Sequence, residues 1–353
     1  MLSLEDAKEL AGQLLNHPDR THDLHLIWHG GEPTLYPPEM AAEIMDCFSR
    51  SAAARSVNMT FGMQTNGLHF PAAWRRLAKD YNIGVGVSID GPASIHNQER
   101  KTIAGIGSYD QVEQTIALLR EDGVSVALLS VVDERHVGKE DEYLDWLNKM
   151  DLPVKLNPCF DCNEAGGQRY YAGYFDFLKN LMLAAGRRTT PFRISPLDWM
   201  LQSLIYEQPP RDCSHSGRCS MDFICLDYAG RLSPCGRFCD QGRFYGLLRQ
   251  VVFDQVLEGD VRAEILARND RLKQGQCRDC SYFLYCGGGC AAWTRETDRQ
   301  PGGAPFPCDN LKKFYGWLEV DGLKLLKDSL VKEKSRLRQN ITMANALLQE
   351  LEP

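Results

Sequence analysis

Strand-like and helix-like segments alternate through the first 160 residues, and this alternation constrains the fold more than any other feature of the chain. Strands that alternate with helices pair in parallel through right-handed crossovers. This part is therefore predicted to be α/β, with too few units for a complete eight-fold barrel but enough for an open, partial one. The predicted strands are 23–31, 57–67, 83–92, 124–132 and 153–161, and the predicted helices are 2–18, 38–54, 71–81, 108–123 and 141–150.

Three of these strands end in short polar motifs. The first is followed by "HGGEP" (29–33), the second ends in "QTNG" (64–67), and the third ends in "SIDGP" (88–92). Carboxyl ends of parallel strands share one rim, where barrels of this kind carry their sites. Adjacent glycines at such a rim leave the backbone bare, so that a ligand can lie against it.

The composition excludes several classes of function. The net charge of −7 and the sequence pI of about 5.7 give no basic surface for nucleic acid. No apolar run approaches the roughly 18 residues that a membrane-spanning helix needs, and the first residues lack the pattern of a signal peptide. We therefore expect a cytoplasmic protein with neither a nucleic-acid nor a membrane partner.

Thirteen cysteines are many for such a protein, and their distribution marks a domain boundary. Only Cys47, Cys159 and Cys162 precede residue 200, whereas ten lie between Cys213 and Cys308. Residues 323–351 contain no Gly or Pro and are predicted to form a long helix. The predicted domains are a partial barrel over 1–165, a helical linker over 166–210, a cysteine-rich domain over 211–310 and a C-terminal helical segment over 311–353.

Eight of the late cysteines follow a regular pattern. It reads C-x5-C, G-x4-C, C-x2-C-x5-C-x3-C and a final C, at Cys213, Cys219, Cys235, Cys277, Cys280, Cys286, Cys290 and Cys308. Thiolates at two-residue spacing can bind one metal centre, and the glycines before Cys290 let the backbone fold around it. Spacing alone favours structural zinc and an iron–sulfur cluster about equally. Disulfides are disfavoured in a reducing compartment.

The full cysteine pattern resembles the SPASM domain of radical S-adenosylmethionine (SAM) enzymes. That resemblance implies two auxiliary 4Fe-4S clusters with interleaved ligands, which favours iron–sulfur over zinc. One cluster would take Cys213, Cys219, Cys235 and Cys290 (set 1), and the other Cys277, Cys280, Cys286 and Cys308 (set 2). Cys225 and Cys239 fall outside the pattern and are interpreted as buried thiols or as thiols near a cluster.

The motifs of the first 100 residues resemble the radical SAM barrel of the same family, from "HGGEP" to "IHNQER" (95–100). The resemblance implies that Gly30, Gly31, Glu32 and Pro33 lie along the methionine end of SAM, with Glu32 placed for its ammonium group. It also implies cofactor contacts for rim residues at the ends of the next strands and beyond. These are Asn66, Ser88, Asp90 and Arg100, for which turn and capping roles remain the alternative.

The family begins with a strand and a C-x3-C-x2-C loop that binds the cluster that reduces SAM. The 353 residues contain no such motif, and the first strand of the barrel has no counterpart in them. We expect an N-terminal truncation, with a third 4Fe-4S cluster only in a full-length form, rather than a degenerate homologue. The genomic sequence upstream of the Met1 codon distinguishes the two.

The resemblance implies a maturase that modifies a peptide or protein side chain by hydrogen abstraction, through oxidation or crosslinking as in ribosomal peptide maturation. Its partners would be a peptide or protein substrate and an electron donor such as flavodoxin or ferredoxin. Anaerobic sulfatase-maturing enzymes carry Asp after the cysteine that corresponds to Cys235, whereas this chain has Gly236. Three alternatives remain: such a sulfatase-maturing enzyme, a non-catalytic iron–sulfur scaffold or peptide-binding homologue, and a zinc-binding structural protein. No catalytic residue is predicted.

Overall fold

The computed structural model describes residues 2–18, 22–162, 168–170, 172–188, 194–210, 212–240, 242–294 and 308–327. Its main feature is a six-stranded sheet of order β1-β2-β3-β4-β5-β8, in which every neighbouring pair is parallel. The strands are β1 (Asp23–Trp28), β2 (Asn58–Thr65), β3 (Gly84–Ser88), β4 (Val126–Val132), β5 (Val154–Pro158) and β8 (Ile194–Ser195). The predicted α/β class and the five predicted strands are confirmed. The two-residue β8 was not predicted, because it is too short to show any periodicity.

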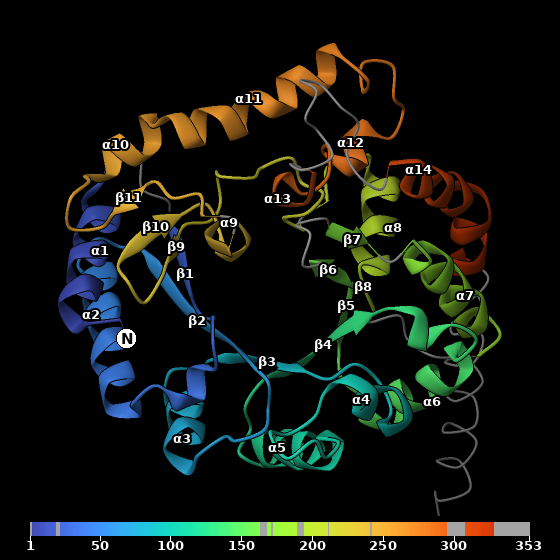
Figure 1. Ribbon diagram of the computed structural model, residues 1–353, viewed down its shortest axis with the longest axis horizontal. Coiled ribbons are helices and arrows are strands. Elements are labelled where there is room, and N and C mark those ends of the chain that lie inside the picture. Colours follow the sequence, from blue (N-terminus) through green and yellow to red (C-terminus); the bar gives the residue numbers. More distant parts are fainter. Residues whose placement is uncertain are drawn as a thin grey trace, which may run out of the picture.

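Helices cover the outer, convex face of this curved sheet (Figure 1). They are α1 (Leu4–Asn16), α2 (Pro38–Ala53), α3 (Ala72–Asp80), α4 (Ala93–Glu99), α5 (Tyr109–Glu121), α6 (Glu140–Met150), α7 (Tyr174–Gly186) and α8 (Leu197–Tyr206). The first helix begins where its sequence requires, because the Ser3 hydroxyl accepts a hydrogen bond from the Asp6 N–H. The short α4 was not predicted, since its seven residues give less than two turns of pattern.

The strand register separates two faces with different side chains. On the outer face, Val85, Val87, Leu128 and Val154 are almost completely buried against the helices. On the inner face, Gly62 of β2 lies between its register partners Ile27 of β1 and Gly84 of β3. Likewise, Leu129 of β4 lies between Ser88 of β3 and Lys155 of β5. This inner face carries three glycines, Gly62, Gly84 and Gly86, together with polar side chains such as Gln64 and Asn157. Neighbouring side chains fill the space beside two of these glycines, since a Cβ on Gly62 would lie 2.8 Å from His25 Nε2 and one on Gly86 would lie 2.9 Å from Leu129 Cδ1.

The C-terminal region crosses the open side of the sheet (Figure 1). A small antiparallel sheet of order β11-β10-β9 consists of β9 (Cys225–Leu226), β10 (Arg231–Ser233) and β11 (Gly246–Leu247). The helices are α9 (Gly236–Asp240), α10 (Phe253–Glu258), α11 (Asp260–Gln274), α12 (Phe283–Cys286), α13 (Ala291–Thr294) and α14 (Cys308–Trp317). A π-helical turn, η3 (Leu318–Gly322), follows, and the helix continues to residue 327. Most of the predicted 323–351 helix lies outside the described residues.

Helix α11 spans the top of the molecule from α10 to the segment that leads into α12 (Figure 1). At the α10 end, the C-terminal region contacts the first helix. Arg249 forms an ion pair with Asp6 at 2.7 Å, and the Gln13 amide donates to the Val251 carbonyl at 3.2 Å. At the other end, Phe314 of α14 packs against Phe175 of α7, with ring centroids 5.3 Å apart. The cysteine-rich segment is therefore attached to the sheet on both sides.

Two further features complete the fold. A two-stranded antiparallel hairpin, β6 (Phe160–Cys162) with β7 (Gln168–Tyr170), follows β5 and was not predicted. Among the described residues, no helix combines the length and the apolar character that a membrane span requires.

Candidate functional site

The loop after β1 is held in place by the carboxylate of Glu32. Its Oε1 accepts from the Thr34 hydroxyl at 2.8 Å and from the Thr65 hydroxyl at 2.6 Å, and its Oε2 accepts from the Asn66 N–H at 2.8 Å. The neighbouring Pro33 is buried and begins the short helix η1 (Pro33–Leu35). Glu32 therefore ties the β1 loop to the end of β2, a role that the motif alone did not reveal.

The two glycines before Glu32 adopt a conformation that other residues rarely take. The φ angles of Gly30 and Gly31 are +84° and +53°, in the left-handed region that glycine enters at little cost. A Cβ built on either residue would have no atom of the described residues within 4 Å. The space beside this backbone is thus left open by the protein, as a site for a bound molecule requires.

Asp90 and Arg100 bind each other at the same rim. The Arg100 guanidinium donates to the Asp90 carboxylate from Nε at 2.7 Å and from Nη2 at 3.0 Å, and the Val131 N–H donates to the same group at 3.0 Å. Asp90 is 2% exposed. This buried, bidentate pair joins the β3 loop to β4, and it orients a guanidinium whose side chain is still 29% exposed.

Two buried histidines support the backbone of Asp90. His136 Nε2 lies 2.8 Å from the Asp90 carbonyl and donates to it, and the Asp90 N–H donates to His96 Nδ1 at 3.2 Å. Burial lowers the pKa of His96 to about 4, so this imidazole is neutral at physiological pH. Neither histidine was predicted to contribute, because an isolated His in a sequence gives no signal of what its ring nitrogens contact.

The predicted rim residues thus lie at the carboxyl ends of β1, β2 and β3 and in the segment after α4. Asn66 takes a turn role, since its side-chain oxygen accepts the Leu68 N–H at 2.8 Å, and Ser88 is buried at the end of β3. The internal hydrogen bonds of Glu32 and Asp90 organise the rim without a ligand. Direct contacts of any of these residues with SAM remain a prediction.

The thiols of set 1 influence one another. Burial raises the pKa of Cys219 to about 12, and repulsion from the thiolates of Cys290, Cys235 and Cys213 contributes to the rise. These are the three other members of set 1, although the sequence separates Cys290 from Cys219 by the whole of β9 to α12. Four thiols from distant segments therefore lie near one another.

Set 2 shows the same behaviour. Burial raises the pKa of Cys286 to about 12, the Gly288 N–H opposes the rise by donating to the thiol, and Cys277, Cys308 and Cys280 add to it. Again the three repelling thiols are the other members of the set. Cys308 reaches its partners from the start of α14, beyond residues 295–307, which lie outside the described part of the chain.

The donor chemistry of the two sets fits iron–sulfur clusters. Within the described ranges, no three His, Cys, Asp or Glu side chains are placed to hold one metal ion. Each thiolate of a 4Fe-4S cluster binds a different iron atom, so its four sulfur ligands stand further apart than those around a single zinc ion. Raised thiol pKa values mean that binding must release protons.

The segment between the two sets, Gly287 to Gly289, folds back tightly. All three glycines have positive φ, of +54°, +77° and +68°. A Cβ on Gly287 would lie 2.3 Å from the Gly217 nitrogen and 2.5 Å from the His215 carbonyl. The glycine segment after Cys286 therefore packs backbone to backbone against the loop between Cys213 and Cys219, which only glycine permits.

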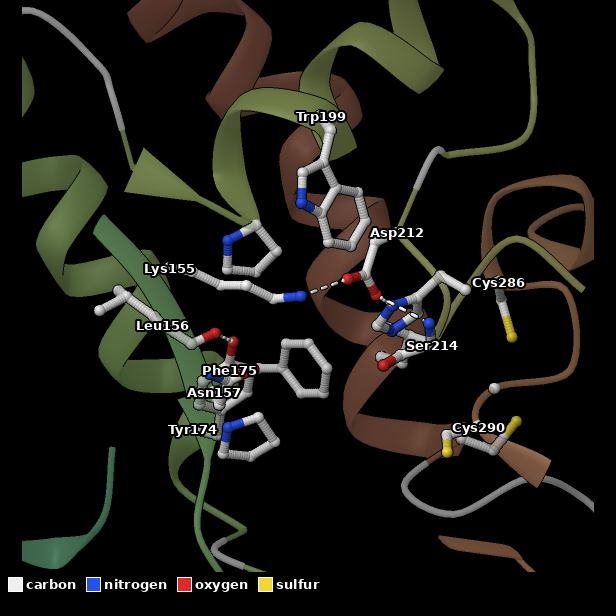
Figure 2. Close-up of a pocket in the computed structure, with 16 residues that line it drawn as sticks. Lys155, Leu156, Asn157, Tyr174, Phe175, Trp199, Asp212, Ser214, Cys286 and Cys290 are labelled. Carbon is white, nitrogen blue, oxygen red and sulfur yellow. Dashed lines mark hydrogen bonds and ion pairs between the residues drawn. The ribbon is translucent and has the colours of Figure 1, made fainter. Parts of the chain in front are cut away.

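A pocket lies where β5, α7 and α8 meet the cysteine loops, and Figure 2 shows its lining side chains. Cys290 of set 1 and Cys286 and Cys308 of set 2 all line it. The opposite wall includes Asn157 of β5 and Trp199 of α8. This pocket therefore joins the inner face of the sheet to both groups of thiols.

An ion pair crosses the pocket. Lys155 Nζ of β5 lies 2.8 Å from Asp212 Oδ1, and the Ser214 N–H donates to Asp212 Oδ2 at 2.9 Å (Figure 2). Burial raises the pKa of Asp212, but His215 and Lys155 outweigh it and hold the pKa well below its usual range. The Asp212 carboxylate thus ties the Cys213 loop to the sheet. Sequence reasoning missed this pair, because its residues are 57 positions apart.

The comparisons with known proteins agree with this geometry. Residues 1–147 match the model of the Radical SAM superfamily. The chain is 25% identical over 308 residues to a cysteine-type anaerobic sulfatase-maturating enzyme of Clostridium perfringens, covering 82% of this chain and 79% of that protein. The N-terminal part is therefore similar to the Radical SAM superfamily, and most of the chain is distantly similar in sequence to these maturating enzymes.

Solved structures with peptides share the fold. Native anSMEcpe with bound AdoMet and Cp18Cys peptide matches 92% of this chain and 90% of that chain, with a TM-score of 0.77 and 20% identity. Streptococcus suis SuiB bound to precursor peptide SuiA matches 87% of this chain and 69% of that chain, with a TM-score of 0.60 and 12% identity. The α/β sheet and the small antiparallel sheet thus form an architecture found in two peptide-bound proteins.

Proposed function

We propose that the chain is a radical SAM/SPASM maturase that modifies a peptide or protein side chain by hydrogen abstraction, leading to oxidation or crosslinking. One observation carries the proposal: eight cysteines interact as two interleaved groups of four, beside a pocket that opens from the inner face of a parallel sheet. The Radical SAM match and the homology to maturating enzymes support it.

In this proposal the sheet is a partial radical SAM barrel, and SAM lies against the bare backbone of Gly30 and Gly31. Bound SAM and a 4Fe-4S cluster that reduces it supply the radical that removes a substrate hydrogen atom. Among the described residues, the Glu32 Oε2 accepts one hydrogen bond, from the Asn66 N–H. This oxygen can therefore accept another hydrogen bond from an ammonium group. Arg100, oriented by Asp90, presents its exposed edge to a carboxylate.

The substrate segment would enter the pocket next to Cys286 and Cys290, whose sets would hold two auxiliary 4Fe-4S clusters able to accept an electron from the oxidised substrate. The wall of this pocket formed by Lys155 and Asn157 of β5 would face the substrate there. A flavodoxin or ferredoxin would serve as the electron donor. The peptide-bound homologues support a peptide or protein as substrate.

Iron and sulfide analysis tests the cluster assignment. Anaerobic reconstitution should give about eight irons per chain, as two 4Fe-4S clusters require. Cys219→Ala and Cys280→Ala should each lose about half of the iron, and the double variant nearly all of it. Cys47→Ala, in α2, is the matched control and should lose none. Stoichiometric zinc in place of iron would refute the assignment and favour the structural zinc protein.

An anaerobic sulfatase-maturing enzyme is the second candidate, because the relative from Clostridium perfringens has that activity in its name. In that family an Asp follows the cysteine that corresponds to Cys235, where this chain has Gly236, the first residue of α9. We therefore favour another peptide substrate. Conversion of a sulfatase-derived cysteine or serine peptide to formylglycine would reverse this preference.

A non-catalytic iron–sulfur scaffold is the third candidate. Formation of 5′-deoxyadenosine from SAM and a reductant separates it from an enzyme. The 353 residues carry no C-x3-C-x2-C motif, so we expect none from them alone. Protein produced from the native locus, with any residues encoded in frame before Met1, should form it. If that protein also forms none, the scaffold is favoured.

A further inference from the structure

Helix α11 places one arginine against the segment that links the two cysteine sets. The Arg268 guanidinium donates from Nη1 to the Gly289 carbonyl at 3.4 Å and from Nη2 to the Gly288 carbonyl. Both carbonyls belong to the short segment between Cys286 of set 2 and Cys290 of set 1. Arg268 therefore contacts the shortest stretch of backbone that joins neighbouring ligands of different sets.

The next residue of the same helix holds the opposite loop. The Asn269 side-chain amide donates to the Gly217 carbonyl, which lies between Cys213 and Cys219 of set 1. Gly217 is also in contact with Gly287, since a Cβ on Gly217 would lie 3.4 Å from the Gly287 Cα. Two consecutive side chains of α11 thus bind the Gly287–Gly289 segment and the loop between Cys213 and Cys219, whose backbones are in contact.

The charge of Arg268 reaches thiols of both sets. Its guanidinium contacts the carbonyls of Gly288 and Gly289, which follow Cys286 of set 2 by two and three positions and precede Cys290 of set 1 by two and one. By contrast, Lys312 lies one turn after Cys308 of set 2 on α14. An arginine keeps its charge at all accessible pH values, so its effect on nearby thiolates is permanent.

We propose that Arg268 is a positioning residue shared by the two auxiliary clusters: it fixes the Gly287–Gly289 link and raises both reduction potentials together. A positive charge favours the state with one more electron, and both clusters lie within reach of the same guanidinium. A matched shift leaves the potential difference between the clusters unchanged, so the charge favours reduction of both without opposing the passage of an electron from one to the other. The inference rests on the proposed function, because it requires two clusters.

Redox titration followed by electron paramagnetic resonance of the reconstituted protein tests the proposal. Arg268→Gln should shift both auxiliary midpoint potentials to more negative values. Lys312→Gln should shift one potential only, that of the set 2 cluster. Arg271→Gln is the matched control, because Arg271 is an exposed cation one turn along α11 that donates to the Glu264 carbonyl, away from the cysteine loops. It should shift neither.

A second variant separates charge from position. Arg268→Lys keeps the charge but cannot donate to two carbonyls from a planar fork. It should retain both potentials nearly unchanged, while amide hydrogen exchange of the cluster-free protein rises at residues 286–290. If Arg268→Gln moves one potential only, or moves both no further than Arg271→Gln does, Arg268 is not shared and the proposal is wrong. Absence of iron from the unsubstituted protein would instead refute the proposed function.

Discussion

The parallel sheet and the cysteine-rich segment bury very different amounts of apolar side chain. The sheet and its helices share one large core, which includes fully buried Trp74, Ile44 and Leu128. Within the described part of the chain, the cysteine-rich segment adds Cys286 to that core and has two small groups of its own, one of four buried residues around Phe238 and one of three around Leu232. Apolar burial contributes roughly 25 cal/mol per Å², so it stabilises the sheet more than it stabilises the cysteine-rich segment.

The two regions also keep their polar sites in different ways. At the rim of the sheet, Glu32 and Asp90 are bound by neighbouring protein groups before any ligand arrives. In the cysteine-rich segment, thiols repel one another and their burial penalises the thiolate form. The rim is therefore preorganised, whereas the cysteine loops need an inorganic centre to make their arrangement favourable.

Removal of iron should have the largest effect, and the effect should differ between the two regions. Chelation under anaerobic conditions should abolish protection from hydrogen exchange at 213–219 and 277–290 while leaving β2 to β4 protected, because those three strands contain no cysteine. Mass spectrometry of exchanged peptides measures both regions in one sample. Equal loss of protection in both would show that the regions do not differ in their dependence on clusters.

Truncation of a side chain in the sheet core should destabilise the fold without removing iron. Trp74 is completely buried, and its indole N–H donates to the Tyr36 carbonyl at 2.9 Å. Trp74→Ala should lower the free energy of unfolding by about 3–5 kcal/mol, measured by denaturant unfolding. Iron content per folded chain should stay unchanged. Tyr206→Ala, at a residue 69% exposed, is the control and should cost little.

Two glycine substitutions test how tightly the cysteine loops are packed. Gly288 and Gly230 share a φ of +77°, but a Cβ on Gly288 would lie 2.5 Å from Leu272 Cδ1, while one on Gly230 would meet nothing within 4 Å. Either alanine costs about 1–2 kcal/mol for its left-handed backbone. Only Gly288→Ala should also reduce bound iron, as measured by iron analysis after reconstitution. Equal iron in the two variants would contradict tight packing at this link.

The last prediction is a pH dependence of stability that belongs to the sheet alone. Burial lowers the pKa of His96 to about 4, from about 6.5 in the unfolded chain. The unfolded state therefore binds the proton first, so stability should fall as pH drops from about 6.5 to about 4 and should not change above that window. His96→Gln should flatten this part of the profile of unfolding free energy against pH, whereas exposed His22→Gln should not. An unchanged profile in His96→Gln would show that His96 does not titrate in this window.

The sequence alone determined the α/β class, five strands and the rim that their polar ends share. It could do so because apolar periodicity and loop chemistry are local properties, which each segment carries wherever it lies. The eight-cysteine pattern likewise stood out from spacing alone, and the resemblance to the SPASM domain supplied the two interleaved sets. The domain boundaries and the individual cofactor contacts stay predictions.

Only the tertiary structure decided what those residues touch. Glu32 binds Thr65 and Asn66, Lys155 binds Asp212, and Arg268 binds the link between Cys286 and Cys290. Each of these contacts joins segments that are distant along the chain, and no local pattern encodes which distant partner a polar side chain meets. Packing of the helices on the curved sheet, and of α11 across its open side, determines these side-chain contacts.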